Sequence, residues 1–216
     1  MTPALTPGIL QAGAAAIAAL DRAALDRAAL HARLDRDGWA LLPALFDAPA
    51  IAALLACLPP QGPGVAAGAF APLHAALYAQ LAPLANAWAQ TLQTGWRYPA
   101  SAPAGAQPDI RLDIVETGHA RPLTQHEPAP DVFPLQLVAL LSDPKRDFAG
   151  GELVLTEQRP RMQSRPIVIP LRQGDAALIP TAHRPCRGAH GFYRASLRQA
   201  ISPVRAGRRV GLALLP

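Results

Sequence analysis

The sequence lacks several features that mark common protein classes. Its two cysteines, Cys57 and Cys186, are too few for a disulfide scaffold, and no Cys-x-x-Cys pair is present. Reduced thiols in the cytoplasm are therefore expected. The chain also has no G-x-G-x-x-G or P-loop motif, and none of its serines stands in a nucleophile elbow. These absences exclude dinucleotide-binding, P-loop and serine-hydrolase functions of the common kinds.

The chain also lacks the basic segment that opens a secretory signal peptide. An apolar stretch covers residues 9–20, but no Lys or Arg precedes it. The stretch is too short and too rich in alanine for a membrane span. The sequence therefore predicts a soluble, cytoplasmic protein.

Lysine is nearly missing, because Lys145 is the only one among 20 basic residues. Arg, Ala, Pro and Gly enrichment together is typical of GC-rich coding, so the arginine content alone does not indicate nucleic-acid binding. The charge is nevertheless uneven: residues 145–216 have a net charge of +9 and residues 1–144 a net charge of −4. The basic half could attract phosphate, carboxylate or nucleic acid, or it could present a solvated arginine surface.

Helices are expected in the first half of the chain. A helical pattern over residues 6–36 should end at Gly38, since glycine suits the position after a helix. A second helix, residues 47–58, begins with an aspartate as N-cap. A third, residues 72–94, contains Pro83, which should kink or split it. Between these helices we expect a short strand at 39–43 and loops at 59–68 and 98–108.

The second half reads as an antiparallel β structure. It begins at residues 110–115, and residues 132–141 form its most apolar predicted strand. Gly174 and Asp175 suit a tight turn before a strand, and residues 142–149 read as a charged loop. Short apolar runs separated by Gly, Pro and Arg predict a sandwich or barrel. The runs are 153–155, 167–171, 176–179, 197–201 and 210–215.

Several spaced motifs in this half occur in the order found in one known family. They are Gly-Gly-Glu-Leu at 150–153, Pro-Leu-Arg-Gln-Gly-Asp at 170–175, Arg-Pro-Cys-Arg-Gly at 184–188 and the segment 202–209. With them the chain resembles the bacterial 2-oxoglutarate/Fe(II) oxygenases, which are prolyl-hydroxylase-like. It is most similar to a branch loosely labelled as acting on damaged nucleic acid. The resemblance implies one α+β domain over 1–216, with a helical part at 1–108 packed on a double-stranded β-helix, or jelly roll, at 109–216.

The family holds iron with two histidines and one carboxylate. Phe133-Pro134-Leu135-Gln136 sets the register of the resemblance, which then places the ligand positions at Thr124, His126 and Gln199. A hydroxyl and an amide are weak ligands, and the loss of even outer-shell partners costs metal affinity roughly 10–100-fold. We therefore expect no iron bound in the family's way and no cofactor.

A relocated iron site is the open alternative. His119, His126, Glu127 and Asp131 could supply two imidazoles and a carboxylate if their loop folds back. In that case Fe(II) and 2-oxoglutarate would be the cofactors. Adjacent residues of a strand face opposite sides, however, so His126 and Glu127 would not act together on a regular strand.

The resemblance keeps part of the acid-binding side of the pocket. Arg209, with Arg208 beside it, matches the arginine that binds the distal carboxylate of 2-oxoglutarate. Arginine suits a bidentate carboxylate contact. Val115 stands where the family often has a helper tyrosine. Arg209 could bind an acid, pair with a carboxylate such as Asp113, or point into solvent from a hairpin turn.

The catalytic residues are not identified, and His126, Glu127 and His183 are the candidates. Asp113, Glu116 and Glu127 could serve as general bases. Cys186, three residues after His183, could be an activated thiol or a buried inert one. His183 and His190 could equally be structural. Arg159, Arg161 and Arg165 form a loop that could contact a substrate or partner, or only solvent.

Three hypotheses follow for the function. In the first, the chain keeps the jelly-roll pocket and acts without metal, as an enzyme on a small molecule or as a binding protein. In the second, it is an active dioxygenase, a hydroxylase or demethylase, with relocated ligands. In the third, it is a pseudoenzyme that serves as an interaction module. Oligomeric state and substrate are not encoded in any motif of the sequence.

Overall fold

The computed structural model describes residues 14, 16–17, 27–56, 70–103, 105–106 and 108–216. In these residues, three helices precede most of the strands. The helices are α2 (Arg27–Asp37), α3 (Ala48–Ala56) and α4 (Ala71–Thr91). The start of the predicted helix at residue 6, the predicted loop 59–68 and Cys57 lie outside the described residues. No helix in the described part of the chain is long and apolar enough to cross a membrane.

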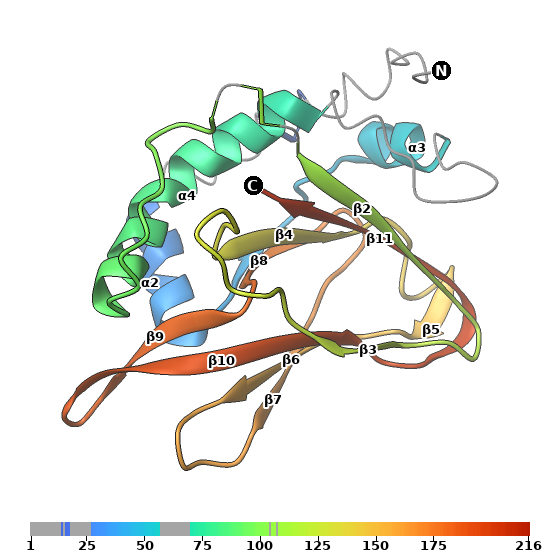
Figure 1. The fold of residues 1–216 in the computed structure, drawn as a ribbon. Coiled ribbons are helices and arrows are strands. Elements are labelled where there is room, and N and C mark those ends of the chain that lie inside the picture. The colour runs from blue at the N-terminus through green and yellow to red at the C-terminus, as the bar shows by residue number, and fades with distance from the viewer. Residues whose placement is uncertain (1–13, 15, 18–26, 57–69, 104, 107) are drawn as a thin grey trace.

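The strands form two antiparallel sheets (Figure 1). We call the first sheet A; its order is β1-β8-β4-β11-β2, and β5 also pairs with β11. Its strands are β1 (Ala40–Leu42), β2 (Asp109–Glu116), β4 (Leu135–Leu140), β5 (Phe148–Gly150), β8 (Ala176–Pro180) and β11 (Val204–Leu215).

The second sheet, sheet B, has the order β3-β10-β6-β7, and β9 also pairs with β10. Its strands are β3 (Arg121–Thr124), β6 (Leu153–Gln158), β7 (Arg165–Ile169), β9 (His183–Gly188) and β10 (Gly191–Ile201). Two antiparallel sheets behind N-terminal helices confirm the predicted α+β jelly roll.

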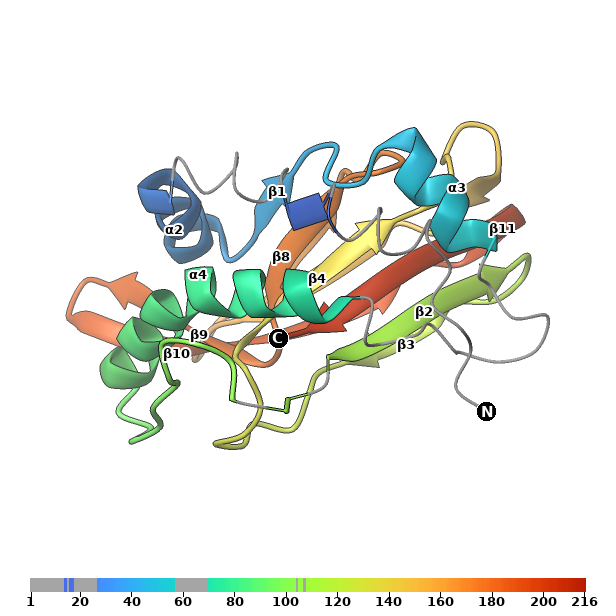
Figure 2. The same ribbon diagram turned by 90° about the horizontal axis from the view of Figure 1, so that it is seen from above.

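Sheet A is the middle layer of three, between the helices and sheet B (Figures 1 and 2). Strand β4 is buried over its whole length because both of its faces are covered. Leu135 and Leu137 pack with helical residues such as Leu77, whereas Val138 and Leu140 belong to the core between the sheets. This alternation explains why residues 132–141 read as a continuous apolar run.

Helix α2 ends at Gly38, as predicted, and two constraints require glycine there. Its φ is +79°, and its backbone N–H donates to the carbonyl of Leu34 at 3.0 Å. A Cβ at this position would also lie 2.6 Å from Nε of Arg184. The glycine therefore both ends the helix and makes room for a buried arginine.

Helix α4 runs through Pro83 as one element, so the predicted split does not occur. Pro83 itself is exposed, while Leu81 and Leu84 on either side of it are buried in the core shared with sheet A. These contacts hold both halves of the helix on the sheet and offset the loss of the backbone hydrogen bond that proline removes.

The N-cap of α3 is as predicted, because Asp47 Oδ1 accepts a hydrogen bond from the N–H of Ala50 at 2.9 Å.

The predicted strand pattern holds with additions. Strand β4 begins at Leu135 rather than at residue 132, and β5 lies partly within the predicted loop 142–149. Strands β3 and β9 have no apolar run, and β9 reads His-Arg-Pro-Cys-Arg-Gly. It forms because six of its residues pair in register with β10, from Gly188 opposite Gly191 to His183 opposite Ser196. Partner strands, rather than local hydrophobicity, define these elements.

The tight turn at Gly174-Asp175 leads into β8. It also holds the segment after β1 through hydrogen bonds. Gly174 has a φ of +85°, and a Cβ there would lie 2.4 Å from the carbonyl oxygen of Phe46. The carboxylate of Asp175 accepts hydrogen bonds from the N–H groups of Ala44 at 2.9 Å and Arg172 at 3.0 Å. The turn predicted from these two residues is thus confirmed.

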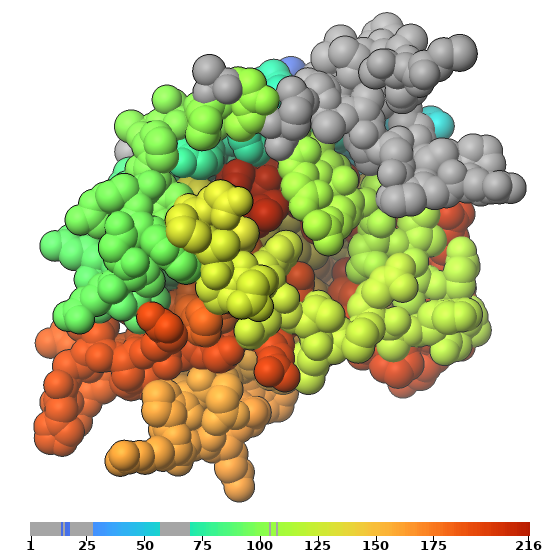
Figure 3. All heavy atoms as spheres, viewed as in Figure 1, coloured from blue at the N-terminus to red at the C-terminus, as the bar shows by residue number. Residues whose placement is uncertain are grey.

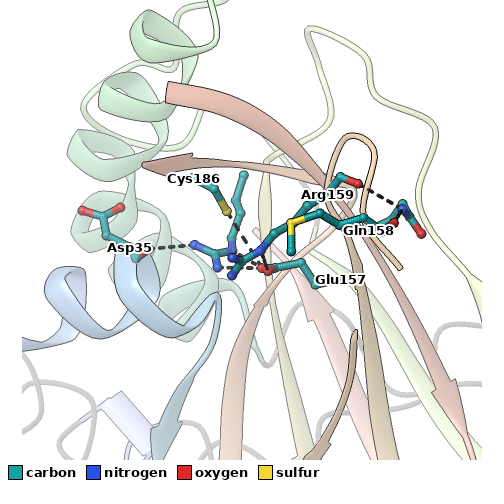
Figure 4. A network of polar contacts seen from close by, with 7 residues as sticks. Asp35, Glu157, Gln158, Arg159 and Cys186 are labelled. Atoms are coloured by element: carbon teal, nitrogen blue, oxygen red, sulfur yellow. Dashed lines mark hydrogen bonds and ion pairs between the residues drawn. The ribbon is translucent and has the colours of Figure 1, made fainter. Parts of the chain in front are cut away.

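A buried ion pair fixes α2 to sheet B. Arg184 and Glu157 are 2% and 1% exposed, and their closest side-chain atoms are 2.6 Å apart. Arg184 Nη1 also donates to the carbonyl of Asp35 in α2 at 2.7 Å, and Arg159 Nε donates to Glu157 at 2.6 Å. Figure 4 shows Asp35, Arg159 and Cys186 around Glu157. Burial acts to raise the pKa of Glu157, but both arginines outweigh it and hold that pKa below its usual range.

Replacing Arg184 by methionine should destabilise the fold by about 3 kcal/mol, because the Glu157 carboxylate would remain buried with Arg159 as its one ion-pair partner among the described residues. Urea-induced unfolding measures this loss. The matched control is Arg208→Met, which removes an exposed pair with Glu116 and should change stability by no more than about 0.5 kcal/mol. The double change Glu157→Met with Arg184→Met should recover part of the loss. Equal effects of Arg184→Met and Arg208→Met would contradict the role given to the buried pair.

Candidate functional site

A cavity of about 370 Å³ lies between the two sheets, and we call it the sheet cavity. It is bounded by β2 and β11 of sheet A and by β3 and β10 of sheet B. Its charged and polar lining residues are Arg111, Asp113, Arg121, Thr124, Gln199 and Arg209. The volume is in the range of small-molecule sites.

Two of the three positions that the resemblance assigns to iron ligands lie on the wall of this cavity. Thr124 on β3 and Gln199 on β10 are direct partners in the antiparallel ladder, and both line the cavity. His126 lies beyond the end of β3. Its backbone N–H donates to the carbonyl of Thr181 at 3.0 Å, and its Nε2 is 3.4 Å from Oε1 of Gln136. His126 is not among the residues that line the sheet cavity.

These side chains do not fit an Fe(II) ion. The cavity wall offers a hydroxyl and a carboxamide where two imidazoles and a carboxylate would be needed. Within the described residues, no group of three His, Cys, Asp or Glu side chains is placed to hold a metal ion. Thr124, His126 and Gln199 thus present a hydroxyl, an imidazole and a carboxamide at the positions that the resemblance assigns to the ligands.

The candidates for a relocated site do not come together either. His119 is exposed in the turn after β2, where its Nδ1 is 3.2 Å from the carbonyl oxygen of Thr117. Glu127 is exposed, and Asp131 lines a different cavity, next to α4. The loop that carries these residues does not fold back to form a shared site with His126.

Arg209 is the most unusual side chain of the sheet cavity. It is 1% exposed, and its Nε donates to the carbonyl of Gly151 at 2.9 Å. Its Nη1 lies 3.8 Å from Oδ2 of Asp113 and makes no hydrogen bond to any described residue. Burial lowers the pKa of Arg209, and the charge of Asp113 acts in the opposite direction.

The structure thus separates the alternatives that the sequence left open for Arg209. The arginine is buried and faces the cavity, so it does not point into solvent from a hairpin turn. Asp113 lies near it but leaves Nη1 without a hydrogen bond, and a buried unsatisfied donor is costly. Val115 pairs with Arg209 across the β2–β11 ladder and is buried, but it has no hydroxyl to assist a bound acid. Arg209 therefore presents a buried N–H without a hydrogen-bond partner among the described residues at the edge of the cavity.

Arg208 is directed away from the sheet cavity. It is half exposed, and its Nε lies 3.1 Å from Oε1 of Glu116 on the neighbouring strand. Adjacent residues of β11 face opposite sides, so Arg208 and Arg209 cannot bind the same ligand without a local change of the strand.

The lining of the sheet cavity carries an excess of positive charge. Arg111, Arg121 and Arg209 oppose one lining carboxylate, that of Asp113. Arg121 Nε donates to Asp113 at 2.8 Å, which holds this carboxylate in place. Arg111 pairs outward with Asp109 at 2.7 Å. No motif in the sequence marks Arg111 or Arg121, although the period-two spacing of residues 111, 113 and 115 places these three on one face of a strand.

The remaining candidates lie elsewhere. His183 lines a small cavity next to α4, and its pKa is lowered by burial and by Arg194, with Glu127 acting in the opposite direction. Cys186 is buried beside Glu157, and burial raises the pKa of its thiol, which supports the inert reading. His190 is exposed in the β9–β10 turn.

The arginine-rich loop after β6 also lies outside the sheet cavity. Arg159 is engaged by Glu157, and Arg161 and Arg165 are exposed. Arg161 has a φ of +61°, in the left-handed region that few side chains adopt. None of the three lines the sheet cavity.

The chain matches known proteins at both the sequence and the fold level. A family model described as "Oxygenase, catalysing oxidative methylation of damaged DNA" matches residues 66–215. An uncharacterized protein of Mycobacterium tuberculosis is 44% identical over 84 residues, which are 39% of this chain and 36% of that relative. The match thus spans about a third of the curated relative's length.

Solved structures share the fold at low sequence identity. A prolyl-4-hydroxylase of Pseudomonas putida is 15% identical with a TM-score of 0.50, over 88% of this chain and 90% of that chain. A 2OG-Fe(II) oxygenase family protein of Burkholderia pseudomallei is 19% identical with a TM-score of 0.53, over 88% and 89%. Prolyl 4-hydroxylase of Phytophthora capsici is 13% identical with a TM-score of 0.56, over 100% and 68%.

These likenesses agree with the arrangement of the two antiparallel sheets. The family model covers α4 and all of the described strands except β1. From this match and the jelly-roll fold it follows that the chain belongs to the 2-oxoglutarate/Fe(II) oxygenase family, in the branch described as catalysing oxidative methylation of damaged DNA.

Proposed function

We propose that this chain binds a small carboxylic acid in the sheet cavity without iron, as a metal-independent enzyme or a binding protein. The observation that carries the proposal is the buried guanidinium of Arg209, whose Nη1 has no hydrogen-bond partner among the described residues. A carboxylate is the ligand that best satisfies such a group, because the planar fork of arginine matches its two oxygens.

The charge of the cavity supports an acidic ligand. Three arginines and one aspartate line it, and two of the arginines, Arg111 and Arg121, are already paired with carboxylates in the protein. Arg209 is left with the distant Asp113 alone, at 3.8 Å. A bound carboxylate at Arg209 would restore the hydrogen bond that the fold does not supply.

The opposite wall would hold the rest of the ligand. The side chains of Thr124 and Gln199 make no hydrogen bond to any described residue, so both are free to serve a bound molecule. A hydroxyl and a carboxamide can each donate and accept. They suit uncharged polar groups, such as a hydroxyl or a carbonyl, in the position that iron holds elsewhere in the family.

If the chain is an enzyme, Asp113 is the residue placed to move a proton. Of the carboxylates proposed as general bases, Asp113 lines the cavity, whereas Glu116 and Glu127 do not. Arg121 binds its Oδ1 at 2.8 Å and leaves Oδ2 directed toward Arg209. A general base must lie within hydrogen-bond reach of the proton that it accepts, and a ligand held by Arg209 would lie next to this carboxylate.

An iron-dependent oxygenase with relocated ligands receives less support. His119, His126 and Asp131 are dispersed over a turn, a loop and a second cavity, and a working site would require all three to move. The reaction on damaged DNA that describes the family is therefore not carried over to this chain. An interaction module remains the outcome if no small acid binds.

The acid-binding role of Arg209 can be tested by titrating 2-oxoglutarate and succinate into metal-free protein by calorimetry. We expect binding by the unaltered chain and a loss of about tenfold to a hundredfold in Arg209→Met, since a hydrogen bond to a charged group contributes about 1.5–3 kcal/mol. Arg208→Met is the matched control and should bind like the parent. Equal binding by all three proteins, with the fold intact by circular dichroism, would rule out Arg209 as the carboxylate site.

Iron binding provides the second test. Anaerobic titration with Fe(II) should leave no tightly bound, stoichiometric iron on the parent chain, because its ligand positions hold Thr124, His126 and Gln199. The triple variant Thr124→His, His126→Asp and Gln199→His should gain iron binding, since two imidazoles and a carboxylate then stand at those positions. Metal analysis after gel filtration measures both. Stoichiometric iron on the parent, with succinate released from 2-oxoglutarate, would instead support the relocated oxygenase site.

A further inference from the structure

A second cavity, of about 360 Å³, lies on the helical side of sheet A, and we call it the helix cavity. It is enclosed by α4, by the loop after α4 and by the loop before β4. Figure 3 shows the surface hollowed in this region, with red atoms of the C-terminal strand at the bottom between green and yellow segments. Its aromatic and charged lining includes His74, Tyr78, Arg97, Tyr98, Asp131 and Phe133.

His74 is a largely buried side chain whose ring centroid lies 6.4 Å from that of Tyr78. It is 4% exposed, it lines the helix cavity, and no described residue makes a hydrogen bond with its imidazole. Burial lowers the pKa of His74, which favours the neutral ring, and a neutral imidazole has one nitrogen that can accept a hydrogen bond. Buried polar groups in proteins are normally paired, so this ring has capacity for a ligand.

An aromatic wall stands beside His74. Tyr78 lies one turn further along α4, and its ring centroid is 4.8 Å from that of Phe133. Tyr98 completes the wall, 5.2 Å from Phe133, and its hydroxyl donates to the carbonyl of Val132 at 3.3 Å. Burial raises the pKa of Tyr98 to about 12, so this ring carries no charge at pH 7. Faces of uncharged aromatic rings attract cations.

Carboxylates outnumber basic groups in the lining of the helix cavity, although one of them, Asp109, is already paired with Arg111. The carboxylates of Asp109 and Asp131 line it, and Arg97 is the single lysine or arginine among its described lining residues. Arg97 donates to the carbonyl of its neighbour Trp96 at 3.1 Å. Asp131 makes no ion pair with any described residue, so its negative charge is available to a ligand.

We propose that the helix cavity binds an organic amine, with its ammonium group at Asp131 and over the aromatic wall, and with His74 accepting a hydrogen bond from it. The ligand class follows from three features of the lining, namely a buried imidazole with no hydrogen bond to a described residue, aromatic rings in tilted and edge-on contact, and a carboxylate with no ion pair to a described residue. The inference does not depend on acid binding in the sheet cavity, because the two sites share no lining residue.

Benzylamine is a suitable probe, because it is cationic at pH 7.5 and carries one aromatic ring. Benzyl alcohol and benzoate are matched for size and differ in charge. Ligand-observed NMR or calorimetry at low salt should show binding of benzylamine at least tenfold tighter than of either analogue, since ammonium contacts with rings and a carboxylate together contribute about 1.4 kcal/mol or more.

Substitutions locate the binding site. Asp131→Asn should weaken benzylamine binding about fivefold, as expected for the loss of an exposed charge partner. Glu127→Gln, on the same loop but outside the cavity, is the matched control and should bind like the parent. His74→Phe keeps the ring and removes the acceptor, and should also weaken binding. Because Asp131 is exposed, its variant tests the proposal even if His74→Phe fails to fold.

The proposal is overturned if benzyl alcohol or benzoate binds as tightly as benzylamine, or if Asp131→Asn and Glu127→Gln bind benzylamine equally. Arg209→Met should leave benzylamine binding unchanged while it weakens acid binding, so the two sites can fail separately. Loss of benzylamine binding in Arg209→Met would place the amine in the sheet cavity and also contradict the inference.

Discussion

The structure around the sheet cavity depends on a positive charge that is buried without full compensation. Arg209 is enclosed by the two sheets, and its nearest carboxylate, Asp113, is also held by Arg121. Burying a cation that lacks its hydrogen bonds is unfavourable, and core packing in both sheets must offset this cost. A group that is retained at such a cost is more readily explained by a ligand than by stability.

Much of the fold could be predicted because local signals and tertiary packing agree. The Asp47 cap, the Gly38 stop and the Gly174 turn are each set by the chemistry of one residue. The continuous apolar strand β4 reflects burial on both faces. Strand β9 and the unbroken α4 could not be predicted, because the first depends on pairing with β10 and the second on packing against sheet A on both sides of Pro83.

The candidate site was predicted less completely, for a related reason. A motif register located Thr124, Gln199 and Arg209, which the fold does bring to one cavity. The sequence could not tell whether Arg209 was buried, because that depends on which face of β11 is turned toward sheet B. It also did not show that Arg121 reaches across to Asp113, since an ion pair between neighbouring segments has no local pattern. The helix cavity joins three distant segments, so no motif marked it.

Strand β2 serves as a common wall for the core on one side and the sheet cavity on the other. Arg111 and Asp113 line the cavity, while Ile110 and Ile114 pack against the core shared with the helices. A single-residue insertion or deletion in this strand would exchange the two sets, placing apolar side chains beside Arg209 and charged ones beneath α4. Related chains can therefore vary in loop length around both cavities, but the length of β2 should tolerate little change over evolution.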